Sequence, residues 1–166
     1  MKVVITGHTQ GLGKAIADYF TEHGHEVVGL SRATGFDLAT GTGYFSALQV
    51  AQTAELFVNN ANVGKVQTQY LKLLKGCLPM ITCGSMAADF PHLGNYHLEK
   101  RSLEDWNRKL DLAPLYCPSL FLKMGYLEGS KVEKFKPISY ADVVRAIEFW
   151  LTNKRITLIE FDNQPI

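Results

Sequence analysis

The chain has 166 residues, which is enough to bury a sizeable core, and we expect one domain over residues 1–166. Its charge is nearly balanced, with 17 Lys and Arg against 16 Asp and Glu. Nucleic acids and anionic membrane surfaces both select proteins with a basic face, so this balance argues against either as a partner.

The cysteines and histidines show no pattern of metal ligands. Three cysteines have no metal-ligand spacing, and five histidines form no paired-ligand motif, so the sequence predicts no metal site. We find no signal-peptide pattern and no apolar run long enough to span a bilayer. Reduced thiols are then the default, and we expect a cytoplasmic protein.

The first predicted unit is a strand, a glycine loop, a helix and a second strand. MKVVI, residues 1–5, is a short apolar run rich in β-branched residues, typical of a buried parallel strand. Residues 14–23 carry apolar side chains at helical spacing, and Gly24 follows as a stop signal. HEVVGL, residues 25–30, predicts the second strand.

The loop between the first strand and the helix is TGHTQGLG, residues 6–13. Glycines in such a loop allow a tight turn, close approach of the backbone to a pyrophosphate, and close packing of the helix on the sheet. The helix N-terminus adds free N–H groups and partial positive charge. The unit therefore predicts a dinucleotide-binding loop. The alternative is a strand-to-helix turn without a ligand.

The remainder of the chain alternates strands and helices. We predict helices over residues 44–53, 66–74, 95–110 and 139–153. We predict strands over residues 36–38, 55–61, 77–85, 112–118 and 155–162, and an irregular segment over 119–137. Asn95 and Ser139 are N-cap candidates. This alternation predicts an α/β fold, a doubly wound and mostly parallel sheet with helices on both faces and ligands beyond the carboxyl ends of the strands.

Polar side chains follow the predicted strands where such ligands would bind. Residues 59–61, NNA, end one strand, and Ser85 ends the next. Tyr96 and Lys100 are four residues apart, so they share one helix face. A lysine ammonium favours the phenolate form of a neighbouring tyrosine, and a serine hydroxyl can hold a carbonyl oxygen. These groups suit carbonyl reduction. The alternative is an ordinary exposed helix pair and a turn serine.

Together these motifs resemble the short-chain dehydrogenase/reductase family. Residues 6–13 match its Thr-Gly-x-x-x-Gly-x-Gly loop, NNA matches most of its Asn-Asn-Ala-Gly, and YHLEK matches its Tyr-x-x-x-Lys. Ser85 precedes Tyr96 in the order of the family. The resemblance implies that Tyr96 is the general acid/base, that Lys100 lowers its pKa and binds the nicotinamide ribose, and that Ser85 orients the substrate carbonyl.

The resemblance also implies an NAD(P) site and a cofactor preference. Arg32 follows the second strand where an NAD-specific site usually carries an acidic residue, and a guanidinium fits a 2′-phosphate. We therefore expect NADP(H) to be preferred over NAD(H); a solvated surface arginine is the alternative. The residues expected to bind the cofactor are Gly7, Thr9, Gly11, Leu12, Gly13, Ser31, Arg32, Asp37, Asn60, Ala61 and Lys100.

The chain departs from the family pattern in several places. It is much shorter than usual members, and a helix is missing between the second strand and Asp37. The catalytic asparagine that the family carries on the helix after NNA has no secure counterpart, and Asn62 stands where glycine is usual. CPSLFLK replaces the family's Pro-Gly-x-x-x-Thr, with Ser119 for the glycine and Lys123 for the threonine.

Two functional hypotheses follow from these residues. The first is a small NADP(H)-dependent oxidoreductase that reduces a small-molecule carbonyl or oxidises the matching alcohol. The second is a non-catalytic NADP(H)-binding sensor or regulatory module, which the shortened middle and Asn62 favour. Family members associate through the helix after Ala61 and the Tyr-x-x-x-Lys helix. We therefore expect a homodimer, with Leu98, Trp106 and Leu110 as an apolar strip.

Overall fold

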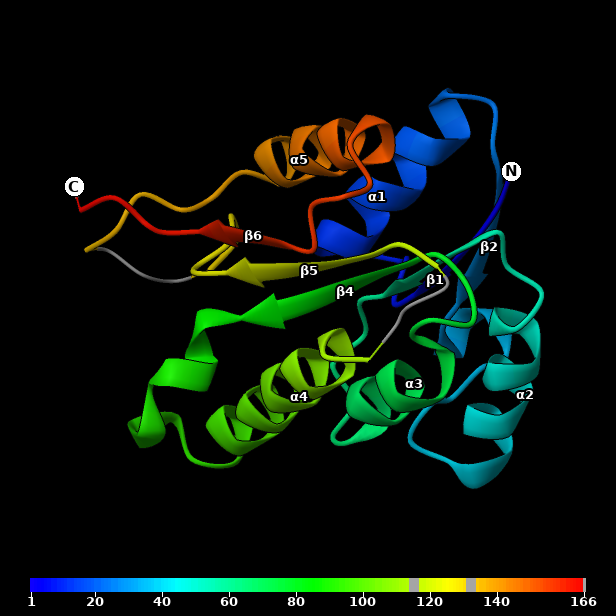
Figure 1. Cartoon of the computed structure of the whole chain (residues 1–166), viewed down its shortest axis with the longest axis horizontal. Helices are drawn as coiled ribbons and strands as arrows, with labels where there is room; N and C mark the ends of the chain where they lie inside the picture. The colour runs from blue at the N-terminus through cyan, green and yellow to red at the C-terminus, as the bar shows by residue number, and fades with distance from the viewer. Residues whose placement is uncertain (114–116, 131–133, 166) are drawn as a thin grey trace.

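The structure is a computed structural model that describes residues 1–113, 117–130 and 134–165. Six strands form one sheet in the order β2-β1-β3-β4-β5-β6, and every neighbouring pair is parallel. Helices α1 and α5 cover one face, and α2, α3 and α4 cover the other (Figure 1). The predicted α/β fold with a doubly wound parallel sheet is confirmed.

Strands and α-helices alternate from β1 to β6. The strands are β1 (Lys2–Thr6), β2 (Glu26–Leu30), β3 (Leu56–Asn59), β4 (Met80–Ser85), β5 (Ser119–Met124) and β6 (Leu158–Phe161). The α-helices are α1 (Gly11–Glu22), α2 (Gly41–Ala51), α3 (Val66–Leu74), α4 (Asn95–Asp111) and α5 (Tyr140–Thr152). Three short 3₁₀ helices are η1 (Arg32–Thr34), η2 (Met86–Asp89) and η3 (Pro91–Leu93).

Strand β1 contributes side chains to two hydrophobic cores, one on each face of the sheet. Val3 and Ile5 face the core under α1 and α5, whereas Val4 faces the core under α2, α3 and α4. All three side chains are fully buried. A strand buried on both faces needs apolar residues at successive positions, which is why β1 is a continuous apolar run. Burying each such side chain contributes about 1.5–3 kcal/mol.

The order of the strands places a crevice beside β1. The chain leaves β1 for β2 on one side, and then crosses back to add β3 on the other side. The connections that follow β1 and β3 therefore diverge at the carboxyl ends of these strands, the usual ligand position in open parallel sheets. The glycine loop and residues 60–61 lie at this point.

The strand predicted over residues 112–118 is wrong. The fifth strand is β5 instead, and all six of its residues are buried. Residues 117–118 are not in a strand, and residues 114–116 lie outside the described part of the chain. The Pro118 carbonyl accepts a hydrogen bond from the Met80 N–H (3.1 Å), but a proline cannot donate to a ladder. The segment expected to be irregular over 119–137 therefore begins only at Gly125.

Two local predictions also differ from the structure. Residues 36–38 form no strand, because η1 is followed by Gly35 at φ 86° and then by Thr40, whose hydroxyl accepts from the Gly43 N–H as the cap of α2. Asn95 is the first residue of α4 and not its N-cap, which is Gly94. Ser139 caps α5 as predicted, with its hydroxyl accepting from the Asp142 N–H.

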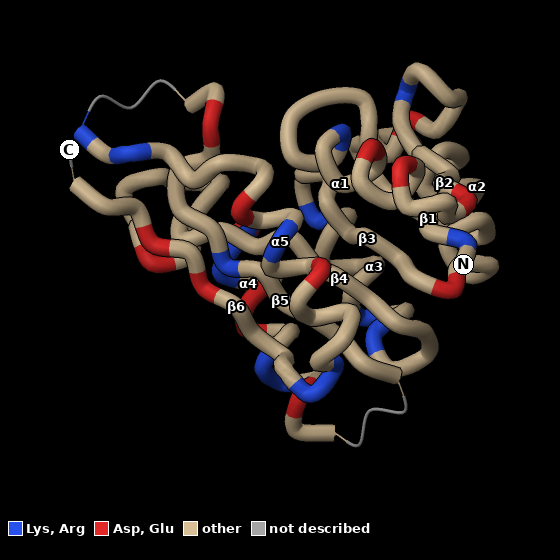
Figure 2. The backbone as a smooth tube through the Cα atoms, turned by 90° about the horizontal axis from the view of Figure 1, so that it is seen from above, with Lys and Arg blue, Asp and Glu red and all other residues tan. Residues whose placement is uncertain are grey.

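The surface carries charges of both signs. Figure 2 shows Lys and Arg interspersed with Asp and Glu along the backbone. Within the described ranges, every helix is too short or too polar to cross a bilayer.

Candidate cofactor cavity and active site

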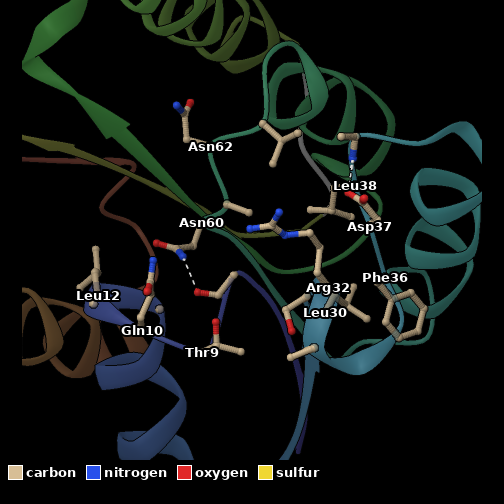
Figure 3. Close-up of a pocket in the computed structure, with 18 residues that line it drawn as sticks. Thr9, Gln10, Leu12, Leu30, Arg32, Phe36, Asp37, Leu38, Asn60 and Asn62 are labelled. Atoms are coloured by element: carbon tan, nitrogen blue, oxygen red, sulfur yellow. Dashed lines mark hydrogen bonds between the residues drawn. The ribbon is translucent and has the colours of Figure 1, made fainter.

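A cavity of about 690 Å³ lies at the crevice beside β1, and we call it the glycine-loop cavity (Figure 3). Its walls come from the loop after β1, from the residues after β2 and from the residues after β3. The structure brings together here every predicted cofactor-binding residue except Lys100, namely Gly7, Thr9, Gly11, Leu12, Gly13, Ser31, Arg32, Asp37, Asn60 and Ala61.

The glycines give the loop its shape. Gly7 and Gly11 have φ of 70° and 55°, in the left-handed region that favours glycine. A Cβ at Gly13 would lie 2.1 Å from the Gly7 carbonyl oxygen, so only glycine lets α1 pack this closely on the loop. Among the described residues, the Gln10 side chain makes no capping hydrogen bond to α1. The first-turn N–H groups of α1 can therefore bind an anion.

Four hydrogen bonds join the carboxyl ends of β1 and β3. The Thr6 hydroxyl accepts from the N–H groups of Asn60 (2.9 Å) and Ala61 (3.0 Å). The Asn60 amide donates back to the carbonyls of Thr6 (3.0 Å) and Gly7 (3.3 Å). Asn60 thus holds the floor of the cavity. We did not predict Thr6 as a site residue, although its place at the start of the glycine loop was a usable signal.

The wall after β2 carries one arginine and one aspartate. Arg32 is exposed in η1, and Figure 3 shows its side chain extending over the cavity. The turn that carries it is held by Thr34, whose hydroxyl accepts from the Ser31 N–H (3.0 Å). Asp37 accepts from the Ala39 N–H (3.1 Å) and lies on the same wall. Lining residues that we did not predict flank those that we did: Gln10, Leu30, Ala33, Phe36, Leu38, Ala39, Asn62 and Val63.

A second pocket, of about 450 Å³, contains two of the predicted catalytic residues, and we call it the Ser85 pocket. Ser85 comes from the end of β4, and Tyr96 comes from the first turn of α4. The Ser85 hydroxyl accepts from the Ala87 N–H (3.1 Å), which leaves its own proton for another acceptor. Tyr96 is 41% exposed, so its phenol is accessible from this pocket.

Lys100 lies behind Tyr96 rather than on a cavity wall. Its ammonium is 5.5 Å from the centre of the Tyr96 ring, and only 4% of the residue is exposed. Burial lowers the pKa of Lys100 to about 8, against the opposing effects of Cys83 and Glu99. The side chain is still mainly cationic at neutral pH. Among the residues that the structure describes, Lys100 lines neither cavity, so its contact with a ribose stays a prediction.

The partner of Lys100 is Gln67, a residue that sequence reasoning missed. The Lys100 ammonium donates to the Gln67 amide oxygen at 2.7 Å. The amide nitrogen of Gln67 donates to the carbonyls of Asn59 (2.8 Å) and Cys83 (2.7 Å). Gln67 is in α3, the helix on which we looked for an asparagine. A search of that helix for glutamine as well as asparagine would have found Gln67 from the sequence.

Lys123 lies in the sheet and not in the irregular segment predicted over residues 119–137. It lies within β5, where its ammonium is 2.7 Å from the Asp89 carboxylate and 3.3 Å from that of Glu104. Burial alone would lower the pKa of Lys123, but these two carboxylates raise it above its ordinary value. Ser119 begins the same strand. Both residues therefore belong to the sheet.

The sequence matches no family model, and no curated protein matches it. Solved structures do resemble the fold. The 3-alpha-hydroxysteroid dehydrogenase from Pseudomonas sp. B-0831, complexed with NADH, has a TM-score of 0.77 and 18% identity over 96% of this chain and 95% of that one. The 3-ketoacyl-(acyl-carrier-protein) reductase from Brucella melitensis, also with NADH, has a TM-score of 0.73 and 18% identity over 97% and 96%.

A short-chain dehydrogenase/reductase from Burkholderia phymatum, in complex with NAD, has a TM-score of 0.67 and 14% identity. That match covers 96% of this chain and 88% of the other. At these identities the likeness shows that this chain has the fold of these dehydrogenases and reductases.

Proposed function

We propose that this protein is an NADP(H)-dependent oxidoreductase of the short-chain dehydrogenase/reductase type, which reduces a carbonyl or oxidises the matching alcohol. One observation carries the proposal: Ser85 and Tyr96 line one pocket, with the buried Lys100 ammonium 5.5 Å from the Tyr96 ring. Structures with this fold hold NADH or NAD, which supports a nicotinamide cofactor.

The glycine-loop cavity is the proposed cofactor site. Its glycines and the N-terminus of α1 suit a pyrophosphate, because N–H groups there face no side-chain cap among the described residues. Asp37 would lie at the adenine end, and Arg32 would bind the 2′-phosphate of NADP(H). The bound nicotinamide would supply the hydride.

The residues of this chain would handle the substrate oxygen and its proton. Ser85 would donate a hydrogen bond to the carbonyl oxygen, which orients the substrate. Tyr96 would give its phenolic proton to the same oxygen as the alcohol forms, and would take it back in the oxidation. The Lys100 ammonium behind the ring stabilises the phenolate that remains.

Replacement of Tyr96 tests this function. Tyr96→Phe keeps the ring and removes only the acidic proton, so turnover should fall by about 10²–10⁴-fold, the usual share of acid–base catalysis. NADPH affinity should change little. The assay is NADPH consumption with a panel of aldehydes, ketones and quinones.

The matched control is Tyr19→Phe, because Tyr19 lies on α1 and lines neither cavity. Unaltered turnover in Tyr96→Phe would refute the mechanism. NADPH binding without turnover in the unmodified protein would favour the sensor function.

The cofactor preference rests on Arg32. NADPH should bind more tightly than NADH, and Arg32→Ala should narrow the difference by about 1.5–3 kcal/mol, as for a hydrogen bond to a charged group. Fluorescence titration of both nucleotides measures this, with Arg155→Ala, another exposed arginine, as the control. Equal affinities of the unmodified protein for NADPH and NADH would contradict the preference.

We further propose that the protein forms a homodimer through α3 and α4. Leu98 supports this proposal, because 63% of this leucine is exposed on α4. Trp106 and Leu110 pack partly against the core of their own chain, so the expected apolar strip is narrower than predicted. A cytoplasmic location stays a prediction.

A further inference from the structure

We infer that the Ser85 pocket selects an uncharged aldehyde or ketone with a flat apolar body, and disfavours anionic substrates. This inference rests on the proposed function for the carbonyl group, but its evidence is the wall of the pocket. The substrate class follows from three features: aromatic walls, a single acidic side chain and a fixed shape.

The walls of the Ser85 pocket gather large apolar side chains that are open to solvent. Phe90, Leu93, Tyr96 and Tyr126 are between 39% and 44% exposed, and all four line this pocket. Contiguous apolar surface of this kind, with polar groups beside it, marks a binding site. The Phe135 ring stacks on Tyr126, with centroids 5.9 Å apart and planes 24° apart. Aromatic faces favour a flat ring as their partner.

The size of the pocket fits a small organic molecule. About 450 Å³ is within the range of small-molecule sites and leaves room for a bicyclic ring. The hydroxyls of Ser85 and Tyr96 are two hydrogen-bond donors in this lining that suit a carbonyl oxygen. A flat apolar ketone would therefore place its oxygen at these hydroxyls and its body against the aromatic walls.

The charge of the wall disfavours anions. Among the described lining residues, Asp162 is the single Asp, Glu, Lys or Arg, and His92 is the single histidine; both are exposed. A carboxylate or phosphate on the substrate would face this like charge, and would lose its hydration without a described Lys or Arg to replace it. The glycine-loop cavity differs, since Arg32 lines it. The anion site of the protein is thus the cofactor cavity and not the Ser85 pocket.

The residue after Asp162 fixes the shape of this wall. The Asn163 amide accepts from the Tyr126 N–H, and it donates to the carbonyls of Tyr126 (2.9 Å) and Lys136 (3.0 Å). These bonds tie the end of β6 to the connection after β5. The aromatic wall around Tyr126 is therefore largely formed before a substrate arrives, which preserves its selectivity.

A pair of fluorescent probes tests the inference without turnover. Prodan is a neutral naphthyl ketone, and the dimethylamino-naphthoate of the same ring system is its anionic counterpart. Titrated into the full chain with NADP⁺, Prodan should show a saturable blue shift, and the naphthoate should bind about tenfold more weakly, as expected for an unpaired charge near an acidic residue. Phe90→Ala should weaken Prodan at least fivefold. Phe45→Ala, an exposed phenylalanine on α2 outside both cavities, should not.

The acidic side chain is tested by Asp162→Asn. This variant should bind the naphthoate about threefold more tightly, because the like charge is gone, and the ratio of Prodan affinity to naphthoate affinity should fall by about the same factor. Equal binding of both probes by the unmodified protein, or Prodan binding that Phe90→Ala leaves unchanged, would overturn the inference. Prodan that binds in the expected way but consumes no NADPH supports the pocket assignment and counts against the oxidoreductase function alone.

Discussion

The side chain of Gln67 joins strands β3 and β4 to the lysine behind Tyr96. Gln67 is 2% exposed, and its amide nitrogen donates to the carbonyls of Asn59, the last residue of β3, and of Cys83, within β4. Its amide oxygen then accepts from Lys100 at 2.7 Å. The ammonium is thereby held near the Tyr96 ring. We regard Gln67 as a positioning residue, because it acts on the phenol through Lys100.

Gln67→Glu tests this role through the pH profile of turnover. A carboxylate beside the Lys100 ammonium stabilises its charged form, so the pKa of Lys100 should rise above its value of about 8. The basic limb of the profile should move to higher pH with it. Gln67→Leu should instead lower turnover at least tenfold. Both variants should destabilise the fold by about 2–4 kcal/mol, because in each of them the buried carbonyls of Asn59 and Cys83 lose their donor.

Gln69→Leu is the matched control, since Gln69 is exposed on the same helix. It should leave both the profile and the urea unfolding midpoint unchanged. A Gln67→Glu profile that coincides with that of the unmodified protein would show that Gln67 has a structural role only.

Sequence reasoning placed some site residues and missed others for physical reasons. The glycine loop, Ser85 and Tyr96 follow strands or begin a helix, so the ends of predicted elements bring them near one crevice. Gln67 contacts Lys100 across the α3–α4 interface, and the angle at which two helices pack is not visible in either helix alone. Lys123 was misplaced because its strand begins later than predicted.

At the scale of elements, the contact between the glycine loop and α1 sets the shape of the glycine-loop cavity. A Cβ added at Gly13 would lie 2.1 Å from the Gly7 carbonyl oxygen and 2.5 Å from the Asn60 amide nitrogen. Both neighbours are fixed, one as backbone and the other by its hydrogen bond to Thr6. A methyl group at Gly13 would therefore push α1 away from the loop.

Two glycine substitutions separate this packing effect from helix propensity. Gly13→Ala should lower the free energy of unfolding by about 1–3 kcal/mol through overpacking, and should weaken NADPH binding at least tenfold. Gly41 is in the first turn of α2, and a Cβ added there has nothing within 4 Å. Gly41→Ala should therefore raise the free energy of unfolding by up to about 1 kcal/mol. Urea denaturation and NADPH titration measure both effects. Similar stabilities of the two variants would contradict the packing argument.

The boundaries of β5 show what limits prediction of elements. LAPLYCP and SLFLKM are both short runs rich in apolar residues, and periodicity alone cannot choose between them. Pairing decides, because Ser119–Met124 lie in register with all six residues of β4. Helix α3 was predicted to the residue, since its apolar spacing is unambiguous and Val66–Leu74 needs no such long-range partner.

At the scale of the whole molecule, buried lysines couple stability to pH. Burial lowers the pKa of Lys100 to about 8, and it also lowers the pKa of Lys75 despite the nearby Asp111. Cys83 acts in the opposite direction, because burial raises the pKa of its thiol to about 12 from 9.0. The pH dependence of the free energy of unfolding is therefore the sum of opposing contributions. The contribution of one group is isolated by comparing the unmodified protein with a variant that lacks this group.

Lys100→Met isolates the share of that lysine. Between a folded pKa of about 8 and an ordinary value of 10.5, the unfolded chain holds more protons than the folded one. The contribution of Lys100 to the free energy of unfolding therefore rises with pH, and the rise between pH 8 and pH 9.5 should be about 1.5 kcal/mol. Urea denaturation at both pH values should show the free energy of unfolding of the unmodified protein increasing by this amount relative to that of Lys100→Met.

Lys154→Met, at an exposed lysine, is the control, and its stability should change with pH as that of the unmodified protein does. Parallel pH dependence of Lys100→Met and the unmodified protein would mean that folding does not lower the pKa of Lys100.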